Sequence, residues 1–308
     1  IQETQRENFV NSLQGRIAGI TVTPTNGTNG VVPVGTTYAW SAPVVTGGLT
    51  GGAAGSGASS ITGDLTNPTN IAHTATYIVT PTTGSCVGNP FTVTVTVNPR
   101  PTISAMSSVV CTGSSFSLSP TNVTNGIVPA GTSYSWSAPI VTGGMTGGTS
   151  GSGASVISGT LTNPTSAPQT ATYTVTPVSG SCTGPSFTVT VTVNPRPALT
   201  PMTASVCSGD LFTVTPLDGT NGIVPTGTTY TWTTPSVSGS MIGGTSGSGT
   251  SITGTLTNNT NTAQTATYTV TPTSGTCAGS SFTLTVTVNP RPAVTNMTAT
   301  VCSGSGFS

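Results

Sequence analysis

The sequence predicts an all-β protein built as a tandem array of antiparallel β-sandwich domains. A near-identical unit recurs along the chain, because Trp40, Trp136 and Trp232 are 96 residues apart and each ends a Tyr-x-Trp triplet. That period is longer than the about 20 to 50 residues of solenoid repeats, so we expect each unit to be a whole domain. Within a unit, short runs that alternate apolar residues with threonine are typical of strands with one buried face.

Three Asn-Pro-Arg-Pro sequences mark the boundaries between the units, and each follows a strand-like run. Their prolines are Pro99, Pro101, Pro195, Pro197, Pro290 and Pro292. We expect a non-repeat segment at 1–19, repeat 1 at 20–100 (incomplete at its N-terminus), repeat 2 at 101–196, repeat 3 at 197–292 and the start of a fourth repeat at 293–308. Two prolines per linker favour extended backbone, so we expect semi-rigid joints, an elongated array and a longer parent protein.

The strands of each repeat follow from its alternating segments. Residues 187–193 alternate Phe or Val with threonine, and 171–177 form a second such run, so a turn at 179–181 is expected to join them as a hairpin. Residues 116–120 predict another short strand. The Tyr-x-Trp triplets place two rings on one face, which predicts the core aromatic residues Tyr38, Trp40, Tyr134, Trp136, Tyr230 and Trp232. No helix is predicted inside a repeat.

A glycine-rich segment follows each Tyr-x-Trp strand and is expected to be a surface loop. The residues 153–157 of repeat 2 correspond to 249–252 of repeat 3, which is one residue shorter. A one-residue slip exchanges the two faces of a strand, whereas a surface loop tolerates it. The length difference therefore indicates a loop, whose exposed groups are candidates for contact with sugars or a partner protein.

The composition excludes several classes of function. The chain has five Arg, no Lys and five acidic residues, so it cannot present the basic surface that nucleic-acid binding requires. Its single histidine, His73, is replaced by Gln169 and Gln264 in the other repeats. The acidic residues do not recur, which leaves no catalytic pair and no ligand set for a metal or other cofactor. We expect a protein that is not an enzyme, and no membrane insertion of this segment.

The six cysteines predict an oxidising compartment and leave two pairings open. The expected pairing is within each repeat, Cys111 with Cys182 and Cys207 with Cys277, which leaves Cys86 and Cys302 unpaired in this chain. The alternative pairs cysteines across the linkers, Cys86 with Cys111 and Cys182 with Cys207. No Cys-x-x-Cys occurs, which argues against zinc.

The order of motifs resembles a known family of repeats. The series Val-Cys-Ser-Gly, Tyr-x-Trp, Ala-Thr-Tyr-x-Val-Thr-Pro, Gly-x-Cys-x-Gly and Phe-Thr-Val-Thr-Val-Thr-Val-Asn-Pro over 20–308 resembles the PKD-like, immunoglobulin-like repeats of large Bacteroidota surface proteins. The resemblance implies a secreted cell-surface adhesin of the gliding-motility class, exported by the type IX system, of which this chain is the stalk. Its implied partners are neighbouring repeats of the same chain, other cell-surface proteins and glycans.

Other functions are compatible with the same repeats. One alternative is a subunit of an extracellular filament, and another is a spacer or carbohydrate-binding module of a secreted hydrolase. Residues 1–19 differ from the repeat: Gly15 stands where the period places a cysteine. Residues 8–20 resemble a plug segment of SusC-like transporters, and the spacing of apolar residues after Thr4 predicts a short amphipathic helix.

Overall fold

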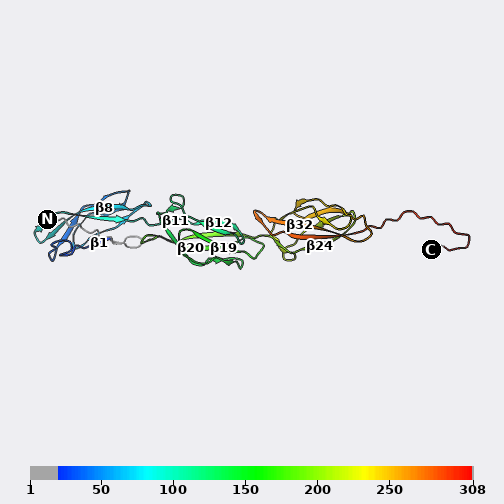
Figure 1. The fold of residues 1–308 in the computed structure, drawn as a ribbon. Coiled ribbons are helices and arrows are strands. Elements are labelled where there is room, and N and C mark those ends of the chain that lie inside the picture. Colours follow the sequence, from blue (N-terminus) through cyan, green and yellow to red (C-terminus); the bar gives the residue numbers. More distant parts are fainter. Residues whose placement is uncertain (1–19, 307–308) are drawn as a thin grey trace. The chain divides into compact units, whose positions relative to one another are not determined.

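The structure is a computed structural model that describes residues 20–306 (Figure 1). All regular structure within that range is β-strand, and the helix predicted for residues 1–19 lies outside it. The chain forms two compact units, one of residues up to 162 with 169–193 and one of residues 163–168 with 194 onward. Repeats 1 and 2 belong mainly to the first unit and repeat 3 to the second.

Repeat 2 contains two main sheets. The larger has the order β12-β22-β20-β15-β18, with β16 and β21 also paired to β20; the smaller has the order β13-β19-β17; and β11 pairs with β14. The strands are β11 (Thr102–Ile103), β12 (Met106–Cys111), β13 (Ser115–Leu118), β14 (Gly126–Ile127), β15 (Ser133–Trp136), β16 (Ile140–Val141), β17 (Thr146–Gly147), β18 (Gly151–Ala154), β19 (Ile157–Thr162), β20 (Gln169–Ser179), β21 (Cys182–Thr183) and β22 (Phe187–Asn194).

Repeat 3 has the same strand order, β24-β34-β32-β27-β30 and β25-β31-β29, with β28 and β33 on β32 and the pair β23-β26. Its strands are β23 (Ala198–Leu199), β24 (Met202–Cys207), β25 (Leu211–Val214), β26 (Gly222–Ile223), β27 (Thr229–Trp232), β28 (Ser236–Val237), β29 (Ile242–Gly243), β30 (Gly247–Gly249), β31 (Ile252–Thr257), β32 (Gln264–Ser274), β33 (Cys277–Ala278) and β34 (Phe282–Asn289). Residues 293–306, the expected start of a fourth repeat, contain no strand.

Repeat 1 builds the corresponding main sheet from β10, β8, β2 and β5, with β3 and β9 paired to β8, and two small sheets, β1-β6 and β4-β7. Its strands are β1 (Ile20–Val22), β2 (Thr37–Trp40), β3 (Val44–Val45), β4 (Thr50–Gly51), β5 (Gly55–Ala58), β6 (Ile61–Gly63), β7 (Leu65–Thr66), β8 (His73–Thr83), β9 (Cys86–Val87) and β10 (Phe91–Val97). The positions equivalent to β12 fall outside the described residues.

The predicted tandem sandwich is confirmed, and the main sheet of repeat 3 also contains a parallel strand pair. The hairpin strands are antiparallel, for example Tyr268 opposite Leu284 and Val270 opposite Phe282. The first strand of the main sheet in repeat 3, β24, runs parallel to the last, β34, from Met202 opposite Leu284 to Cys207 opposite Asn289. Because β24 runs parallel to β34, its last residue, Cys207, lies at the same end of the repeat as Asn289.

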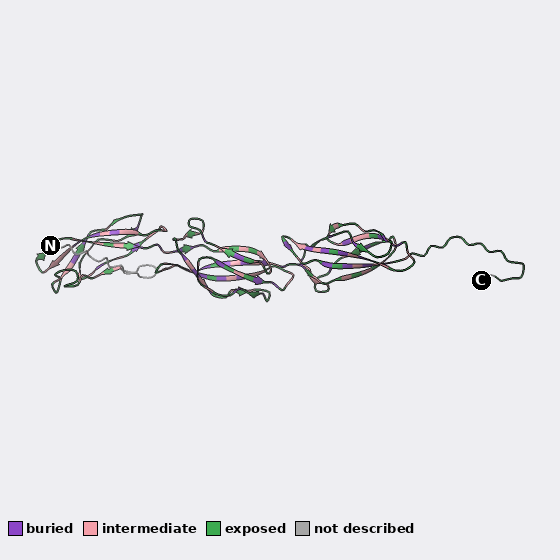
Figure 2. Ribbon diagram, in the orientation of Figure 1, coloured by how far each residue is buried: buried purple, intermediate pink, exposed green. Residues whose placement is uncertain are grey.

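The core of each repeat lies between its main sheet and its smaller sheets. In repeat 2 the inward side chains of the hairpin, Tyr173, Val175, Val189 and Val191, are fully buried, and the ring of Phe116 lies across them with its centroid 5.5 Å from that of Tyr173. Buried residues alternate with intermediate or exposed ones along β22 (Figure 2). The aromatic residues predicted for the core, from Tyr38 to Trp232, are all buried.

The glycine-rich segment is a pair of short strands, so its prediction as a loop was wrong. In repeat 2 it supplies β17 and the edge strand β18, which pairs with the Tyr-x-Trp strand. A Cβ atom on Gly151 would lie 2.3 Å from the ring of Trp136, so only glycine lets the ring lie flat against this strand. Glycine carries no side chain that could reveal a period of two, which is why the pattern failed here.

The one-residue length difference lies in that edge strand. In repeat 2, Tyr134 pairs with Ala154 and Trp136 with Gly151, so three steps on one strand oppose two on the other, which is a β-bulge. In repeat 3, Tyr230 pairs with Gly249 and Trp232 with Gly247 in regular register. The deletion removes the bulge and leaves the Trp strand unchanged.

Candidate functional site

The titratable side chains do not gather into a reactive site. Among residues 20–306, no group of three or more His, Cys, Asp or Glu is placed to hold a metal ion. His73 lies against Gly47, at the position where Gln169 and Gln264 accept hydrogen bonds from the hydroxyls of Thr142 and Ser238. The histidine therefore stands at a position that packs against a turn in every repeat. No helix in the described part of the chain is long and apolar enough to cross a bilayer.

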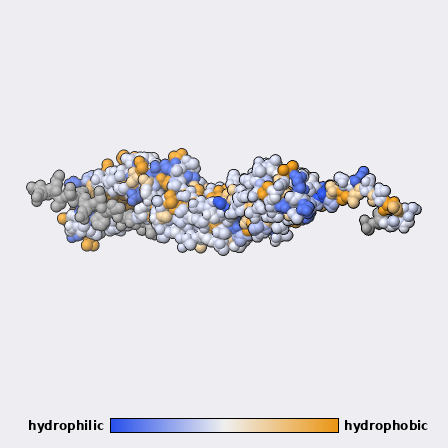
Figure 3. All heavy atoms as spheres, turned by 45° about the vertical axis from the view of Figure 1, so that its right-hand side comes forward, coloured by the Kyte–Doolittle hydropathy of each residue, from blue (hydrophilic) through white to orange (hydrophobic). Residues whose placement is uncertain are grey.

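An open hollow of about 610 Å³ lies on the surface of repeat 2. Its lining is neutral and hydroxyl-rich, and it includes Ser135, Trp136, Ser152 and Thr174. Trp136 is only 9% exposed and its Nε1 donates to the carbonyl of Thr149 at 3.1 Å, so the indole offers no free face for stacking. The visible surface elsewhere carries hydrophobic residues mostly singly rather than as one large patch (Figure 3).

The linkers are more distinctive than the hollow, because they are packed against the repeats that follow them. Pro99 and Pro101 are buried, and Arg100 between them donates from Nε to the carbonyl of Thr183 at 2.9 Å. A Cβ atom on Gly184 would lie 2.2 Å from the carbonyl oxygen of Pro101. The linker before repeat 2 is therefore packed onto the hairpin turn that carries Cys182, and it is part of that repeat rather than a free spacer.

The linker before repeat 3 is packed in the same way. Pro195 and Pro197 are buried, and a Cβ atom on Gly279 would lie 2.1 Å from the carbonyl oxygen of Pro197. Sequence reasoning missed this role, although the signal was present: the glycine of Gly-x-Cys-x-Gly recurs because the preceding linker occupies the space of its side chain.

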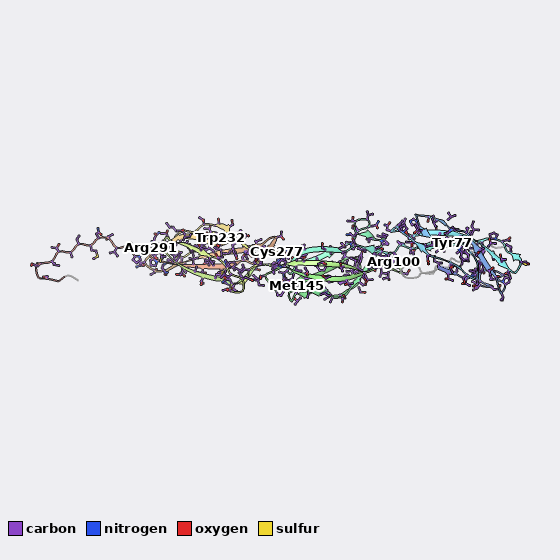
Figure 4. All side chains as sticks on the ribbon, turned by 180° about the vertical axis from the view of Figure 1, so that it is seen from behind. Tyr77, Arg100, Met145, Trp232, Cys277 and Arg291 are labelled. Carbon is purple, nitrogen blue, oxygen red and sulfur yellow. The ribbon has the colours of Figure 1, made fainter. Side chains whose placement is uncertain are left out.

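The two cysteines of a repeat lie at opposite ends of it, so the predicted pairing within a repeat was wrong. In repeat 3, Cys207 lies beside Asn289 at the exit end, whereas Cys277 pairs with Ser274 at the entry end. The 11 residues of β32 separate these levels, roughly 35 Å at the usual rise per residue. A disulfide requires Cα atoms within about 7 Å. Cys277 and Arg291 also mark the two ends of this repeat in Figure 4.

The observed states of the cysteines contradict both pairings weighed from the sequence. Cys111 and Cys277 are disulfide-bonded, and the thiols of Cys86, Cys182, Cys207 and Cys302 are free. The pairing across a linker fails as well, since it needs Cys86 or Cys182 to be oxidised. We refer below to the first cysteine of a repeat as its exit cysteine and to the second as its entry cysteine.

Backbone hydrogen bonds hold the exit cysteine in place. The N–H of Ser208, next to Cys207, donates to the carbonyl of Asn289 at 2.9 Å. The buried Asn258 donates from Nδ2 to the carbonyl of Val288 at 2.9 Å, and its own N–H donates to the Ser208 hydroxyl at 2.9 Å. Asn67 makes the equivalent bond to Val97 in repeat 1. The asparagine ties the end of the last strand to the chain beside the cysteine, a role that the sequence did not reveal.

The entry cysteine lies on an equally defined turn. Cys277 follows a two-residue turn in which Gly275 has a φ of 57°, a left-handed value that favours glycine. The N–H of Gly279 donates to the carbonyl of Pro272 at 2.9 Å and closes the far side of the short strand β33. Repeats 2 and 3 therefore each present one cysteine from a fixed backbone at each end.

Comparisons with known proteins identify the repeat. The profile of a family described as PKD-like domain matches residues 17–101, 108–197 and 204–292. None of the curated proteins matches the chain.

The solved structures to which the chain is similar have low sequence identity and low TM-scores. They include an endo-fucoidan hydrolase of glycoside hydrolase family 107 (13% identity, 93% of this chain and 44% of that chain, TM-score 0.24) and chicken CNTN1 domains FN1–FN3 (10%, 91% and 96%, TM-score 0.29). Cadherin domains 3–6 of protocadherin gamma B2 are a third (14%, 92% and 73%, TM-score 0.27). The chain spans less than half of the two fucoidan hydrolase chains that it matches. Scores of this size carry no argument about function.

Proposed function

Because the chain belongs to the PKD-like domain family over three consecutive repeats, we propose that it is the non-catalytic stalk or spacer of an extracellular protein. The observation that carries this proposal is the construction of the linkers. Each of the first two is buried and packed against the entry turn of the repeat that follows it. Adding a repeat therefore adds length together with a structured joint, which is what a stalk requires.

The chemistry of the cysteines supports an extracellular location. Cys111 and Cys277 are disulfide-bonded, and disulfides persist in oxidising compartments and are rare in the cytosol. The low charge is compatible with this location, because solubility here comes from the hydroxyls and amides of the many Thr, Ser and Asn residues.

We further propose that the parent protein is a cell-surface adhesin of the gliding-motility class of Bacteroidota. The support is the coincidence of cysteines, aromatic residues and Asn-Pro-Arg-Pro linkers in one repeat. In this proposal the repeats provide reach and mechanical strength, and the surface is grasped by another part of the protein.

The stalk proposal is tested by small-angle scattering of chains with one, two and three repeats. The strand β20 alone spans 11 residues, so we expect the maximum dimension to grow by at least roughly 35 Å with each repeat. A maximum dimension that stays constant as repeats are added would contradict the proposal. Hydrolysis of a polysaccharide by the purified chain would contradict its non-catalytic character.

The adhesin proposal is tested in the organism that carries the gene. Removal of residues 101–196, one whole repeat, should reduce attachment of cells to a surface without lowering the amount of protein displayed. Removal of residues 197–292, which form repeat 3, is the matched comparison and should reduce attachment to the same extent. Unchanged attachment in both strains would contradict the adhesive role and leave the stalk architecture unaffected.

A further inference from the structure

The strand β10 of repeat 1 differs from its equivalents in what lies beside it. In repeats 2 and 3 the equivalent strands, β22 and β34, each lie between two strands of the main sheet, with β12 and β24 on their outer sides. Within the described part of the chain, β10 is the edge strand of its sheet and pairs with β8 alone. Among residues 20–306, repeat 1 therefore presents an open strand edge where the other two repeats have a paired one.

The core beside this open edge is partly exposed. Val93 and Val95 are half-buried, whereas the equivalent residues of repeat 3, Leu284 and Val286, are 0% exposed. A narrow, mainly apolar groove lies beside them, and its lining includes Ile20, Val22, Ile61, Tyr77, Val93 and Val95. In repeat 3 the inward side chains of β24 pack against the core at this level, and they are Met202, Ala204 and Val206. The groove therefore lies where repeat 3 receives three apolar side chains from β24.

Residues 297–302 carry the sequence of β24 without forming a strand. They differ from Met202–Cys207 only at Thr300, where β24 has Ser205. The apolar side chains of Met297 and Val301 are 86% and 49% exposed. This segment therefore has the side chains of a core strand but, within the described structure, no core to pack on.

The turn that ends β24 is also present after residues 297–302. The N–H of Ser305 donates to the carbonyl of Cys302 at 3.0 Å, just as the N–H of Asp210 donates to the carbonyl of Cys207 at 3.1 Å. The segment therefore ends in the same turn as β24 does.

We propose that residues 297–302 of one copy of the chain add to β10 of a second copy as a parallel strand. The register of β24 on β34 would place Met297 opposite Val93, and Val301 opposite Val97. Main-chain hydrogen bonds along the added strand provide affinity, and its inward Met, Ala and Val side chains fit the groove. The donor segment and the groove are different surfaces of the chain, so the contact is heterologous and can continue from copy to copy.

Residues 10–15 of the same chain are the competing occupant, because they stand one period before β12. In the same register Gln14 would take the inward position that Val110 has in β12 and Val206 has in β24. Burial of an amide costs free energy unless the amide is hydrogen-bonded. Residues 297–302 keep a valine, Val301, at this position, and the alternation of faces along a strand therefore favours them.

Self-association of the full chain tests the proposal. We expect the mass measured by sedimentation equilibrium to rise from that of one chain to that of two or more as the protein concentration is raised from micromolar to millimolar. Removal of residues 293–308 should keep the mass at that of one chain. A full chain that stays single over this range, as it would if residues 10–15 filled the groove, would overturn the proposal.

Two aspartate variants of the donor segment separate strand addition from other association. Val301 would point inward, as Val206 does, and Thr300 would point outward, as the exposed Ser205 does. Both positions lie outside the folded sheets, so neither change should disturb the repeats. We expect Val301→Asp to abolish the rise in mass and Thr300→Asp to preserve it. Equal effects of the two variants would overturn the proposal, and they would be the result if the copies were joined by disulfides instead.

A new disulfide tests the register. Asn98→Cys places a thiol opposite Cys302 of the second copy, because Asn289 is opposite Cys207 in repeat 3, and the two Cα atoms would lie within the about 7 Å that a disulfide requires. Oxidised glutathione supplies the oxidation by thiol–disulfide exchange and leaves as two thiols. We expect a link between residues 98 and 302 of different copies, seen by electrophoresis without reductant and by peptide mapping.

Thr92→Cys is the matched control for this link. Residue 92 is exposed on the same face of β10, but it lies six residues from position 98, roughly 20 Å at the usual rise. It should therefore not be linked to Cys302. Equal linkage at positions 92 and 98, or none at position 98, would overturn the proposed register and the strand addition with it.

Discussion

The three linkers share the sequence Asn-Pro-Arg-Pro but differ in burial. Pro99, Pro101, Pro195 and Pro197 are buried, whereas Pro290 is half-buried and Pro292 is exposed. The first two linkers lead into complete repeats, and the third leads into residues 293–306, which form no strand. The repeat that follows a linker, and not the linker sequence, therefore determines whether the linker is packed.

The interiors of the repeats show no such dependence. Trp40, Trp136 and Trp232 lie on equivalent glycines, and a Cβ atom on any of those glycines would lie 2.3 to 2.5 Å from the ring. Interior substitutions should therefore have the same cost in repeats 2 and 3. The cost of a substitution in a linker should instead depend on whether a folded repeat is packed against that linker.

The largest effect is expected for the core tryptophans. Trp136→Ala and Trp232→Ala should each lower the free energy of unfolding of their own repeat by about 3–5 kcal/mol, because a large buried ring is lost and a cavity remains. Denaturant unfolding followed by near-UV circular dichroism measures both. Costs that differ by more than about 1.5 kcal/mol would break the claim that the interiors are equivalent.

Gly184→Ala separates the packed linker from the turn itself. The new Cβ atom would lie 2.2 Å from the carbonyl oxygen of Pro101, so we expect a loss of about 1–3 kcal/mol in repeat 2. Gly88→Ala is the matched control, because the atom nearest to its Cβ, 2.9 Å away, belongs to the ring of Pro81, and Gly184 has a similar contact with Pro177. Thermal unfolding of both variants checks the difference. Equal costs would mean that the linker contributes nothing.

Arg100, in a packed linker, should contribute more to stability than Arg291, in the exposed linker. Arg100→Ala removes a charge-assisted hydrogen bond to the carbonyl of Thr183 and should cost about 1.5 kcal/mol. Arg291 bonds Asp210 in an ion pair whose side chains are 59% and 50% exposed, so Arg291→Ala should cost at most about 1 kcal/mol. Raising the salt concentration should reduce the second effect more than the first. A larger loss of stability for Arg291→Ala than for Arg100→Ala would contradict the packing of the first linker.

The smallest effect is expected at the buried tyrosines of the core. The hydroxyls of Tyr77, Tyr173 and Tyr268 are buried without a hydrogen-bond partner, and burial raises the pKa of each. Tyr173→Phe should therefore leave stability at pH 7 unchanged or slightly higher, within about 1 kcal/mol.

The same tyrosines give stability a dependence on alkaline pH. Because the pKa of Tyr173 is raised above the unfolded value of 10.0, the folded state keeps the phenol proton to a higher pH than the unfolded state does. The free energy of unfolding is therefore unaffected by this group below pH 10 and falls as the pH rises through the folded pKa. Tyr173→Phe should reduce this alkaline loss. A clear loss of stability at pH 7 would show instead that the hydroxyl is satisfied in solution.

The sequence was informative where side chains report their surroundings. The alternation of Phe187 to Val193 predicted a half-buried strand, and the Tyr-x-Trp triplets predicted the core. It was uninformative at Gly151 to Ala154, because glycine does not show which face of a strand it lies on. The disulfide was mispredicted for a different reason. The end of the repeat at which Cys207 lies depends on the parallel pairing of β24 with β34, which sequence separation does not reveal.

The packed linkers define the segment of chain that can be duplicated or transplanted. Pro101 fills the space beside Gly184, and Arg100 donates to the carbonyl of Thr183. A repeat cut out at its first strand, Thr102–Ile103, would lose both contacts, whereas one cut out together with residues 98–101 would keep them. The heritable building block is therefore the linker joined to the repeat that follows it.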